Sequence, residues 1–134
     1  MSVELDEAGF SAWLDSYKSA WEDRDPGAAA ALFTEAATYR ETPYDAPFEG
    51  RAAIEAYWSG AVSGQRDVRF TYEVLACTGD RGLARWHATF KTAEGGDTID
   101  LDGIFHCRFE TQALVGRFEE WWHLKVTPAA PANI

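Results

Sequence analysis

Residues 68–126 decide the fold of this chain, because they contain four long runs in which apolar and polar residues alternate. The runs are VRFTYEVLAC (68–77), LARWHATFKT (83–92), TIDLDGIFHCRF (98–109) and LVGRFEEWWHLKV (114–126). Alternation with a period of two is typical of strands that bury one face. Short segments separate the runs, and the first two of them contain glycines that favour hairpin turns. We therefore expect a four-stranded antiparallel meander.

The alternation also predicts which face of the meander is buried. We expect the apolar face to meet the helices, and it carries Val68, Phe70, Tyr72, Val74, Ala84, Trp86, Ala88, Phe90, Leu101, Gly103, Phe105, Cys107 and Phe109. The opposite face carries charged residues such as Arg69, Arg85, His87 and Asp102, and water or a second subunit must cover it. In the last run both faces mix apolar and polar residues, so the sequence does not decide which way His123 points.

The segment before the meander contains the signals of three helices and one short strand. Apolar residues recur at helical spacing from Phe10 to Arg24, and Asp25-Pro26 then supplies the start of a short second helix that we expect to run through Leu32 and Phe33. Residues 37–42 alternate like a strand, with a loop at Pro43–Gly50. A third helix is expected to begin near Arg51.

The length of 134 residues suits one α+β domain, which we place at residues 1–126, followed by a loosely ordered tail at 127–134. Hydrophobic residues make up 46% of the chain and aromatic residues 14%, which is enough for a core without disulfides or metal. Cys77 and Cys107 fall inside expected strands and are interpreted as free thiols in the core or next to it.

Charge and composition exclude several classes of function. The formal net charge of −10 repels phosphates, which disfavours nucleic acids and anionic membranes as partners. The three histidines His87, His106 and His123 show no metal-ligand spacing, and neither a phosphate-binding loop nor a G-x-S-x-G motif is present, so we expect no metal and no cofactor. An acidic start at residues 1–7 and the lack of a long apolar run predict a cytoplasmic protein.

Four stretches carry a resemblance to a known superfamily: WEDRD (21–25), ALFTEAATY (31–39), GRAAIEAYW (50–58) and RFEEWW (117–122). With the order of helices and strands, they resemble the nuclear transport factor 2-like superfamily, and within it the SnoaL-like polyketide cyclases and the ketosteroid isomerases. The resemblance spans about residues 10–126. It implies a cone-shaped α+β barrel in which three N-terminal helices pack on a strongly curved, mainly antiparallel sheet around a hydrophobic pocket.

The resemblance also implies two residues that act on a substrate. Counted forward from Thr38, Glu41 takes the place of the isomerases' general base; counted backward from Pro43, Thr42 takes it instead. Tyr17 takes the place of the tyrosine that donates a hydrogen bond to the developing oxyanion. A carboxylate in an aromatic pocket would have a raised pKa, which suits a base near neutral pH.

Three further positions bear on the comparison with the isomerases and cyclases. Phe105 stands where the isomerases have a protonated aspartate, and Asp102 would reach the pocket only if a bulge near Gly103 turned it inward. His123 lies near the acidic position of the last strand in the cyclases and could transfer protons. The candidate catalytic set is therefore Glu41, Tyr17, His123 and Asp102.

Aromatic side chains are the expected walls of the pocket. The candidate substrate-binding residues are Tyr39, Trp13, Trp58, Trp86, Phe70 and Phe105, which suit a hydrophobic or aromatic molecule.

Three hypotheses about function follow. The first is a cofactor-independent enzyme doing acid–base chemistry of the isomerase, cyclase, dehydratase or epoxide-hydrolase type. The second is a non-catalytic ligand-binding domain. The third is a protein-interaction module that uses the outer face of the sheet, with a homodimer as its simplest form.

Overall fold

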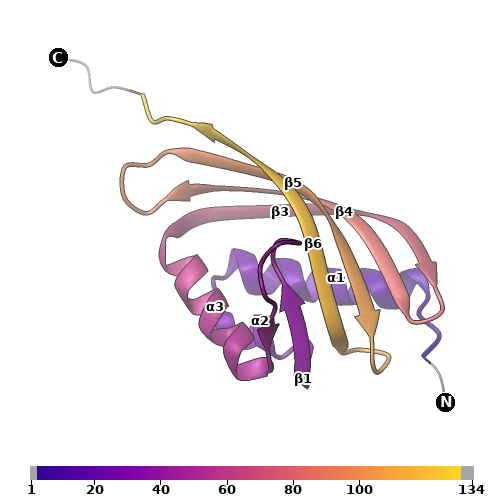
Figure 1. The fold of residues 1–134 in the computed structure, drawn as a ribbon. Helices are drawn as coiled ribbons and strands as arrows, with labels where there is room; N and C mark the ends of the chain where they lie inside the picture. The colour runs from indigo at the N-terminus through magenta and orange to yellow at the C-terminus, as the bar shows by residue number, and fades with distance from the viewer. Residues whose placement is uncertain (1–2, 131–134) are drawn as a thin grey trace.

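The computed structural model describes residues 3–130, which form helices on one face of a six-stranded sheet (Figure 1). The helices are α1 (Glu7–Glu22), α2 (Pro26–Ala30) and α3 (Arg51–Ser63). The strands are β1 (Phe33–Arg40), β2 (Phe48–Glu49), β3 (Gln65–Thr78), β4 (Arg81–Thr92), β5 (Thr98–Phe109) and β6 (Val115–Thr127). The expected cone-shaped α+β fold is confirmed.

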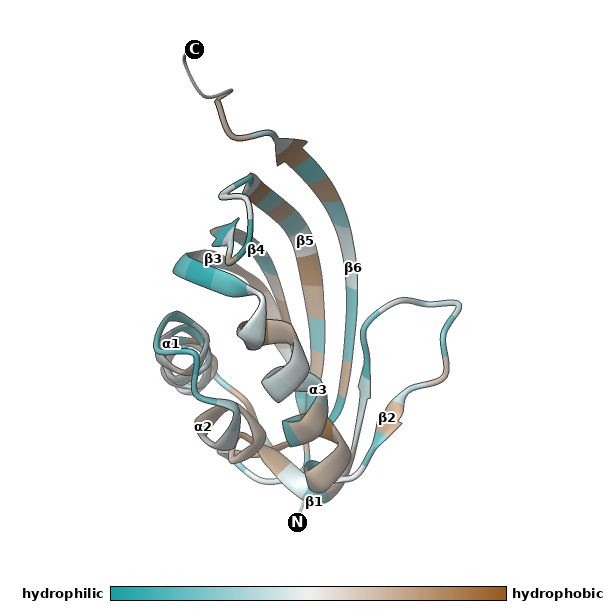
Figure 2. Cartoon of the chain, turned by 90° about the vertical axis from the view of Figure 1, so that its left-hand side faces the viewer, coloured by the Kyte–Doolittle hydropathy of each residue, from teal (hydrophilic) through white to brown (hydrophobic). Residues whose placement is uncertain are grey.

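The sheet has the strand order β2-β1-β6-β5-β4-β3. Strands β3 to β6 form the predicted antiparallel meander, and β1 joins β6 as its parallel neighbour. Figure 2 shows the long strands bending around the helices, which lie on the concave side. Within residues 3–130, no helix is long and apolar enough to cross a membrane.

The concave face of the meander is the buried one, as the alternation predicts. Phe70, Ala84, Phe105 and Cys107 are fully buried there beneath the apolar stripe of α1. The Asp6 carboxylate caps α1 by accepting a hydrogen bond from the Gly9 N–H at 2.7 Å, so the helix begins at Glu7, earlier than expected.

The prediction that the second helix runs through Leu32 and Phe33 is wrong. Helix α2 ends at Ala30, because the Leu32 carbonyl accepts hydrogen bonds from the Trp13 indole N–H at 3.1 Å and from the Val115 N–H at 3.0 Å. Phe33 begins β1 and is fully buried. Tertiary hydrogen bonds and burial thus override the helix propensity of the alanine-rich segment.

The first strand is also longer at its start and shorter at its end than predicted. It ends at Arg40 and not at Thr42, because the Thr42 hydroxyl donates a hydrogen bond to the Asp45 carboxylate at 2.6 Å in the turn that follows. The segment expected to be loop at Pro43–Gly50 contains the two-residue strand β2, which pairs antiparallel with β1. Glu41 therefore lies just beyond the end of β1.

The expected loosely ordered tail differs in part from the structure. Thr127 belongs to β6, and the Ala129 N–H donates a hydrogen bond to the Asp97 carboxylate at 2.9 Å. Residues 131–134 lie outside the described residues. Cys77 and Cys107 are free thiols, half-buried and buried respectively.

Candidate active site

A cavity of about 530 Å³ lies between α3 and the inner face of the sheet. Residues of α1, β1 and the segment after it, α3, β3, β4, β5 and β6 line it. The lining residues are Tyr17, Trp21, Tyr39, Glu41, Ala56, Tyr57, Trp58, Gly60, Ala61, Gln65, Trp86, Phe90, Leu101, Glu120, Trp122 and Leu124. This volume is typical of pockets that hold small organic molecules.

Glu120 on β6 is a buried acid in this cavity, with 6% of its surface exposed. It is the ladder partner of Phe105, so both side chains lie on the inner face of the sheet. Burial, followed by the nearby Glu41 carboxylate, raises the pKa of Glu120 well above its usual value. Its carboxyl group therefore retains a proton at pH values where an exposed glutamate is ionised.

Tyr17 and Tyr39 place two phenol groups at the same end of the cavity. Their hydroxyl oxygens are 3.4 Å apart, close enough for a hydrogen bond, and both side chains are buried. Burial, followed by Glu120, raises the pKa of both tyrosines, so both remain protonated and able to donate hydrogen bonds.

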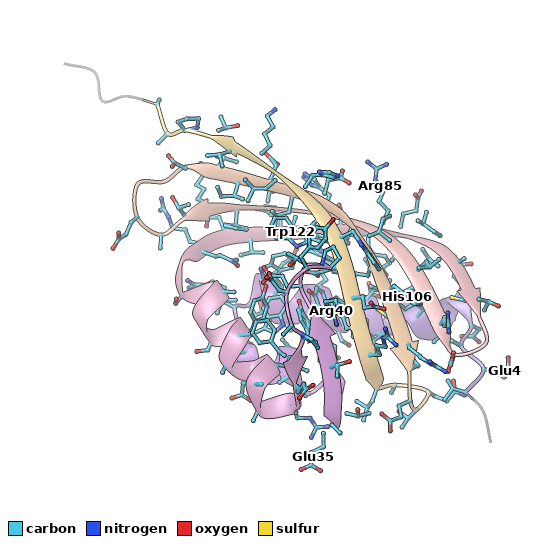
Figure 3. All side chains as sticks on the ribbon, in the orientation of Figure 1. Glu4, Glu35, Arg40, Arg85, His106 and Trp122 are labelled. Atoms are coloured by element: carbon cyan, nitrogen blue, oxygen red, sulfur yellow. The ribbon has the colours of Figure 1, made fainter. Side chains whose placement is uncertain are left out.

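Glu41 lines the cavity from the segment after β1, and Trp122 holds that segment in place. The Trp122 indole N–H donates a hydrogen bond to the Glu41 backbone carbonyl at 3.0 Å; Figure 3 shows Trp122 on β6 at the loop that follows β1. Burial, then Glu120 and Glu41, raise the pKa of Tyr57. Of the two alternatives for the general-base position, Glu41 borders the cavity, whereas Thr42 bonds Asp45 in the turn.

The aromatic residues that the sequence predicts as pocket walls divide into two groups. Tyr39, Trp58 and Trp86 line the cavity. Trp13, Phe70 and Phe105 do not line it and are buried in the core behind it. Their placement corrects the sequence-based expectation: Trp13 packs edge-on against Phe33 and Phe109, and Phe70 and Phe105 stack beneath Trp86.

Asp102 and His123, both in the candidate catalytic set, lie on the outer face of the sheet and do not line the cavity, so the facing of His123 that the sequence left open is outward. They are ladder partners of each other, and the pairing of β4 with β5 runs without a shift from Arg81 to Lys91, so no bulge turns Asp102 inward. Asp102 forms an ion pair with Arg85 at 3.1 Å. Figure 3 shows Arg85 projecting from the sheet away from the helices.

Sequence reasoning missed Glu120 because the register of β6 could not be fixed. A shift of one residue exchanges the two faces of a strand, and the β5–β6 pairing does contain such a shift between Arg108 and Phe109. The sequence did offer one signal. Phe105 was predicted to point inward, and the residue directly opposite it on β6 must point to the same face. Because of the register shift next to the turn, counting from the turn does not show which residue of β6 lies opposite Phe105.

Two tryptophans that line the cavity have buried indole nitrogens without a partner, and residues 3–130 contain no cluster arranged to bind a metal ion. The indole nitrogens of Trp58 and Trp86 are buried and have no partner among the described residues. An unpaired buried donor costs about 1–3 kcal/mol. Across residues 3–130, no group of three or more His, Cys, Asp or Glu side chains is arranged to hold a metal ion.

A family model described as a SnoaL-like domain matches residues 13–117. Among curated proteins, none matches the chain.

Solved structures of the same fold include enzymes and a ligand complex. A Δ5-3-ketosteroid isomerase from Mycobacterium sp. is 15% identical, with 89% of this chain and 98% of that chain covered and a TM-score of 0.76. The epoxide hydrolase/cyclase-like enzyme SalBIII, with a role in pyran ring formation in the polyether salinomycin, is 18% identical, with coverages of 88% and 93% and a TM-score of 0.76. A hypothetical protein with a ketosteroid isomerase-like fold from Catenulispora acidiphila, in complex with trimethylamine, is 15% identical, with coverages of 81% and 83% and a TM-score of 0.72.

Proposed function

The chain belongs to the family of SnoaL-like domains, and from this premise we propose that its cavity binds a small organic molecule and performs cofactor-independent acid–base chemistry on it. The observation that carries the proposal is the buried Glu120 carboxyl group, which shares the cavity with Glu41 and with two tyrosine hydroxyls. A strongly raised pKa in a cavity is a recognised mark of functional carboxyl groups. Similar structures that hold a ligand or act as enzymes support the same general function.

The proposed roles divide the cavity between one base, Glu41, and three proton donors, Glu120, Tyr17 and Tyr39. Glu41 takes a proton from a substrate C–H, whose electron pair then moves toward a carbonyl oxygen. With an epoxide, Glu41 instead takes a proton from a water molecule, whose oxygen bonds to the epoxide carbon as the C–O bond breaks and its electron pair moves to the epoxide oxygen. Glu120 gives its proton to that oxygen, with Tyr17 and Tyr39 as hydrogen-bond donors to the developing charge. Isomerisation, aldol-type cyclisation, dehydration and epoxide opening can each use one base together with a proton donor at the oxygen.

Glu120 also offers a replacement for the acid that the isomerases carry at the position of Phe105. The isomerases' third element is a protonated acid on the strand that carries Phe105 here, and its loss would remove one donor to the oxyanion. Glu120 enters the cavity from the neighbouring strand, directly opposite Phe105. In our proposal, Glu120 therefore supplies the protonated carboxyl group.

Three probe reactions test the proposal: proton abstraction from 5-nitrobenzisoxazole, hydrolysis of styrene oxide and isomerisation of a Δ5-3-ketosteroid. We expect turnover above buffer for at least one probe, and a loss of about 10²–10⁴-fold when the responsible acid or base is replaced. Glu41→Gln should slow every active probe, whereas Glu120→Gln should spare the benzisoxazole, which needs only a base. Glu35→Gln, the same change on an exposed side chain of β1, is the control.

The pH dependence provides a second readout. Because Glu120 acts as the acid, the rate of an acid-requiring probe should fall as the pH rises through its raised pKa. Binding of the probes without any turnover would favour the non-catalytic ligand-binding function instead, and turnover that both variants retain would contradict the roles of Glu41 and Glu120.

The outer face of the sheet is proposed to pair with a second copy of the chain. Trp121 is 45% exposed there and is the ladder partner of Ile104, with charged residues such as Arg85 nearby. An exposed tryptophan with a charged border is a common composition of protein interfaces. Sedimentation of the wild type and of Trp121→Glu should show a dimer and a monomer respectively, and a wild-type monomer at all concentrations contradicts this pairing.

A further inference from the structure

The cavity combines aromatic walls with acidic side chains, which is the composition that recognises an organic cation. Half of its lining residues are aromatic, and its two acids are Glu41 and Glu120. No Lys, Arg or His among the described residues lines it. The faces of tryptophan and tyrosine rings carry negative charge density and attract ammonium groups, more strongly when water is excluded.

The Glu120 carboxyl group is buried without a partner of opposite charge. The influences that raise its pKa are burial and the Glu41 carboxylate, and within residues 3–130 no side chain or backbone group forms a hydrogen bond that would stabilise its ionised form. Buried carboxylates are normally paired, because ionisation in a low-dielectric cavity is costly. Without such a partner Glu120 holds its proton, and a cationic group of a ligand would supply the partner that the ionised form needs.

We propose that the ligand of this cavity carries a tertiary or quaternary ammonium group on an apolar body, and that the aromatic rings and the two glutamates select it over neutral molecules of the same shape. The inference rests on the proposed function of the site and narrows its substrate class. The apolar body would contact Ala61, Phe90, Leu101 and Leu124, which line the same cavity. The net charge of −10 also attracts cations to the protein.

The titration of Glu120 makes the ammonium preference depend on pH. The ionisable groups that face Glu120 are Tyr17 on α1, Tyr39 and Glu41 on and after β1, Tyr57 on α3 and Cys107 on β5. None of these groups is basic. A bound ammonium lowers the pKa of Glu120, so its binding releases protons and strengthens as the pH rises. Acid catalysis by Glu120 has the opposite pH dependence.

Matched pairs of ligands test the inference, because a quaternary nitrogen and a quaternary carbon have nearly the same shape. The probes are choline against 3,3-dimethylbutan-1-ol and benzyltrimethylammonium against neopentylbenzene, measured by calorimetry and by tryptophan fluorescence. We expect each cation to bind about tenfold or more tightly than its neutral partner, a ratio that desolvated cation–π contacts and a carboxylate together can supply. The ratio should rise with pH.

Variants show whether the preference comes from this cavity. Glu120→Gln and Glu41→Gln should each reduce the ratio, the double variant should bring it close to one, and Glu35→Gln should leave it unchanged. Equal or tighter binding of the neutral partners, no binding of either cation at millimolar concentration, or a ratio that survives in the double variant overturns the inference. Turnover of neutral probes without any ammonium preference overturns it too and leaves the proposed function intact, whereas an ammonium preference without turnover removes only the chemistry.

Discussion

The inner and outer faces of the β5–β6 ladder hold carboxyl groups in contrasting surroundings. On the inner face, Glu120 is buried, and burial followed by Glu41 raises its pKa. On the outer face, the Asp102 side chain is about half exposed, and the hydrogen bond from Arg85 lowers its pKa. The two residues lie on adjacent strands, so the difference comes from the side of the sheet and not from the region of the chain.

The difference explains why we assign proton transfer to the inner face. An acid whose pKa is raised keeps its proton to higher pH and can donate it, whereas an aspartate paired with an arginine is held ionised by that partner. His87 and Asp100, with nitrogen and oxygen 3.3 Å apart, add another exposed pair to the outer face. Exposed pairs of this kind contribute little to stability and exchange readily with water.

The largest expected effect on stability comes from truncating a large buried side chain on the inner face. Phe105 is fully buried between Trp86 and Phe118, so Phe105→Ala should lower the free energy of unfolding by about 3–5 kcal/mol. Its neighbour Ile104 is only partly buried on the outer face, so Ile104→Ala should cost less than about 2 kcal/mol. Urea unfolding of both variants measures the comparison, and similar losses would show that the outer face is as well packed as the core.

Glu120→Gln should produce the next largest effect, and that effect should depend on pH. The folded protein holds the Glu120 proton more tightly than the unfolded chain does, so wild-type stability declines as the pH rises from about 4.3, the usual glutamate pKa, toward the raised folded value. The variant lacks this group. Its stability relative to the wild type should therefore increase by up to about 1.4 kcal/mol per pH unit in that range.

Thermal and urea unfolding between pH 4.5 and 8 measure this slope. A cost in stability from the buried amide of the variant would not depend on pH. That cost does not affect the test, because the test uses only how the difference in unfolding free energy between variant and wild type changes with pH. Glu35→Gln should show no such slope, since Glu35 is exposed on β1. A difference between Glu120→Gln and the wild type that stays flat over the whole range contradicts a raised pKa for Glu120.

Substitution of Gly103 tests whether the inner face of the sheet has room for one additional methyl group at this position. A Cβ added there would lie 2.8 Å from the Trp122 Cβ and 3.0 Å from the Trp86 ring, and it would also overlap the Trp121 carbonyl oxygen. Gly103→Ala should therefore cost about 1–3 kcal/mol in urea unfolding. Gly60→Ala is the matched change: in α3 a Cβ meets no neighbour, so the variant should gain up to about 1 kcal/mol. A tolerated Gly103→Ala would show that the ladder shifts to make room.

Much of this fold could be predicted from the sequence, because the meander carries its own pattern. The alternation in residues 68–109 predicted the strands and their faces. Asp25 and Pro26 indicated the start of α2, and an apolar stripe at helical spacing indicated α3. The errors occurred where tertiary contacts outweigh local preference. Leu32 leaves the second helix because its carbonyl bonds with Trp13 and Val115, which are distant in the sequence.

The candidate site was predicted less well, since it depends on register and on the depth of the cavity. Tyr17 and Glu41 line the cavity as expected, and their placement needed only the first helix and the end of β1. Glu120 was missed and His123 was chosen in its place because a one-residue shift near the β5–β6 turn decides which of them points inward. Alternation alone also could not separate residues that line the cavity, such as Trp86, from those behind it, such as Phe105.

The smallest expected effect belongs to Asp102 and has the opposite pH dependence to that of Glu120. Asp102→Asn removes the ion pair with Arg85. Both side chains of this pair are largely exposed, so the variant should lose at most about 1 kcal/mol of unfolding free energy near neutral pH. Because the pKa of Asp102 is lowered in the folded protein, the pair's contribution is present above the usual aspartate pKa of about 3.9 and is lost as the pH falls through the folded value. The cost of the variant should therefore shrink below about pH 4 and should also shrink in concentrated salt, which screens exposed charges.

Urea unfolding at pH 3, 5 and 7, with and without added salt, measures both trends. A cost that grows as the pH falls, or that salt leaves unchanged, would mean that Asp102 is held in surroundings like those of Glu120 and that the two faces do not differ as described.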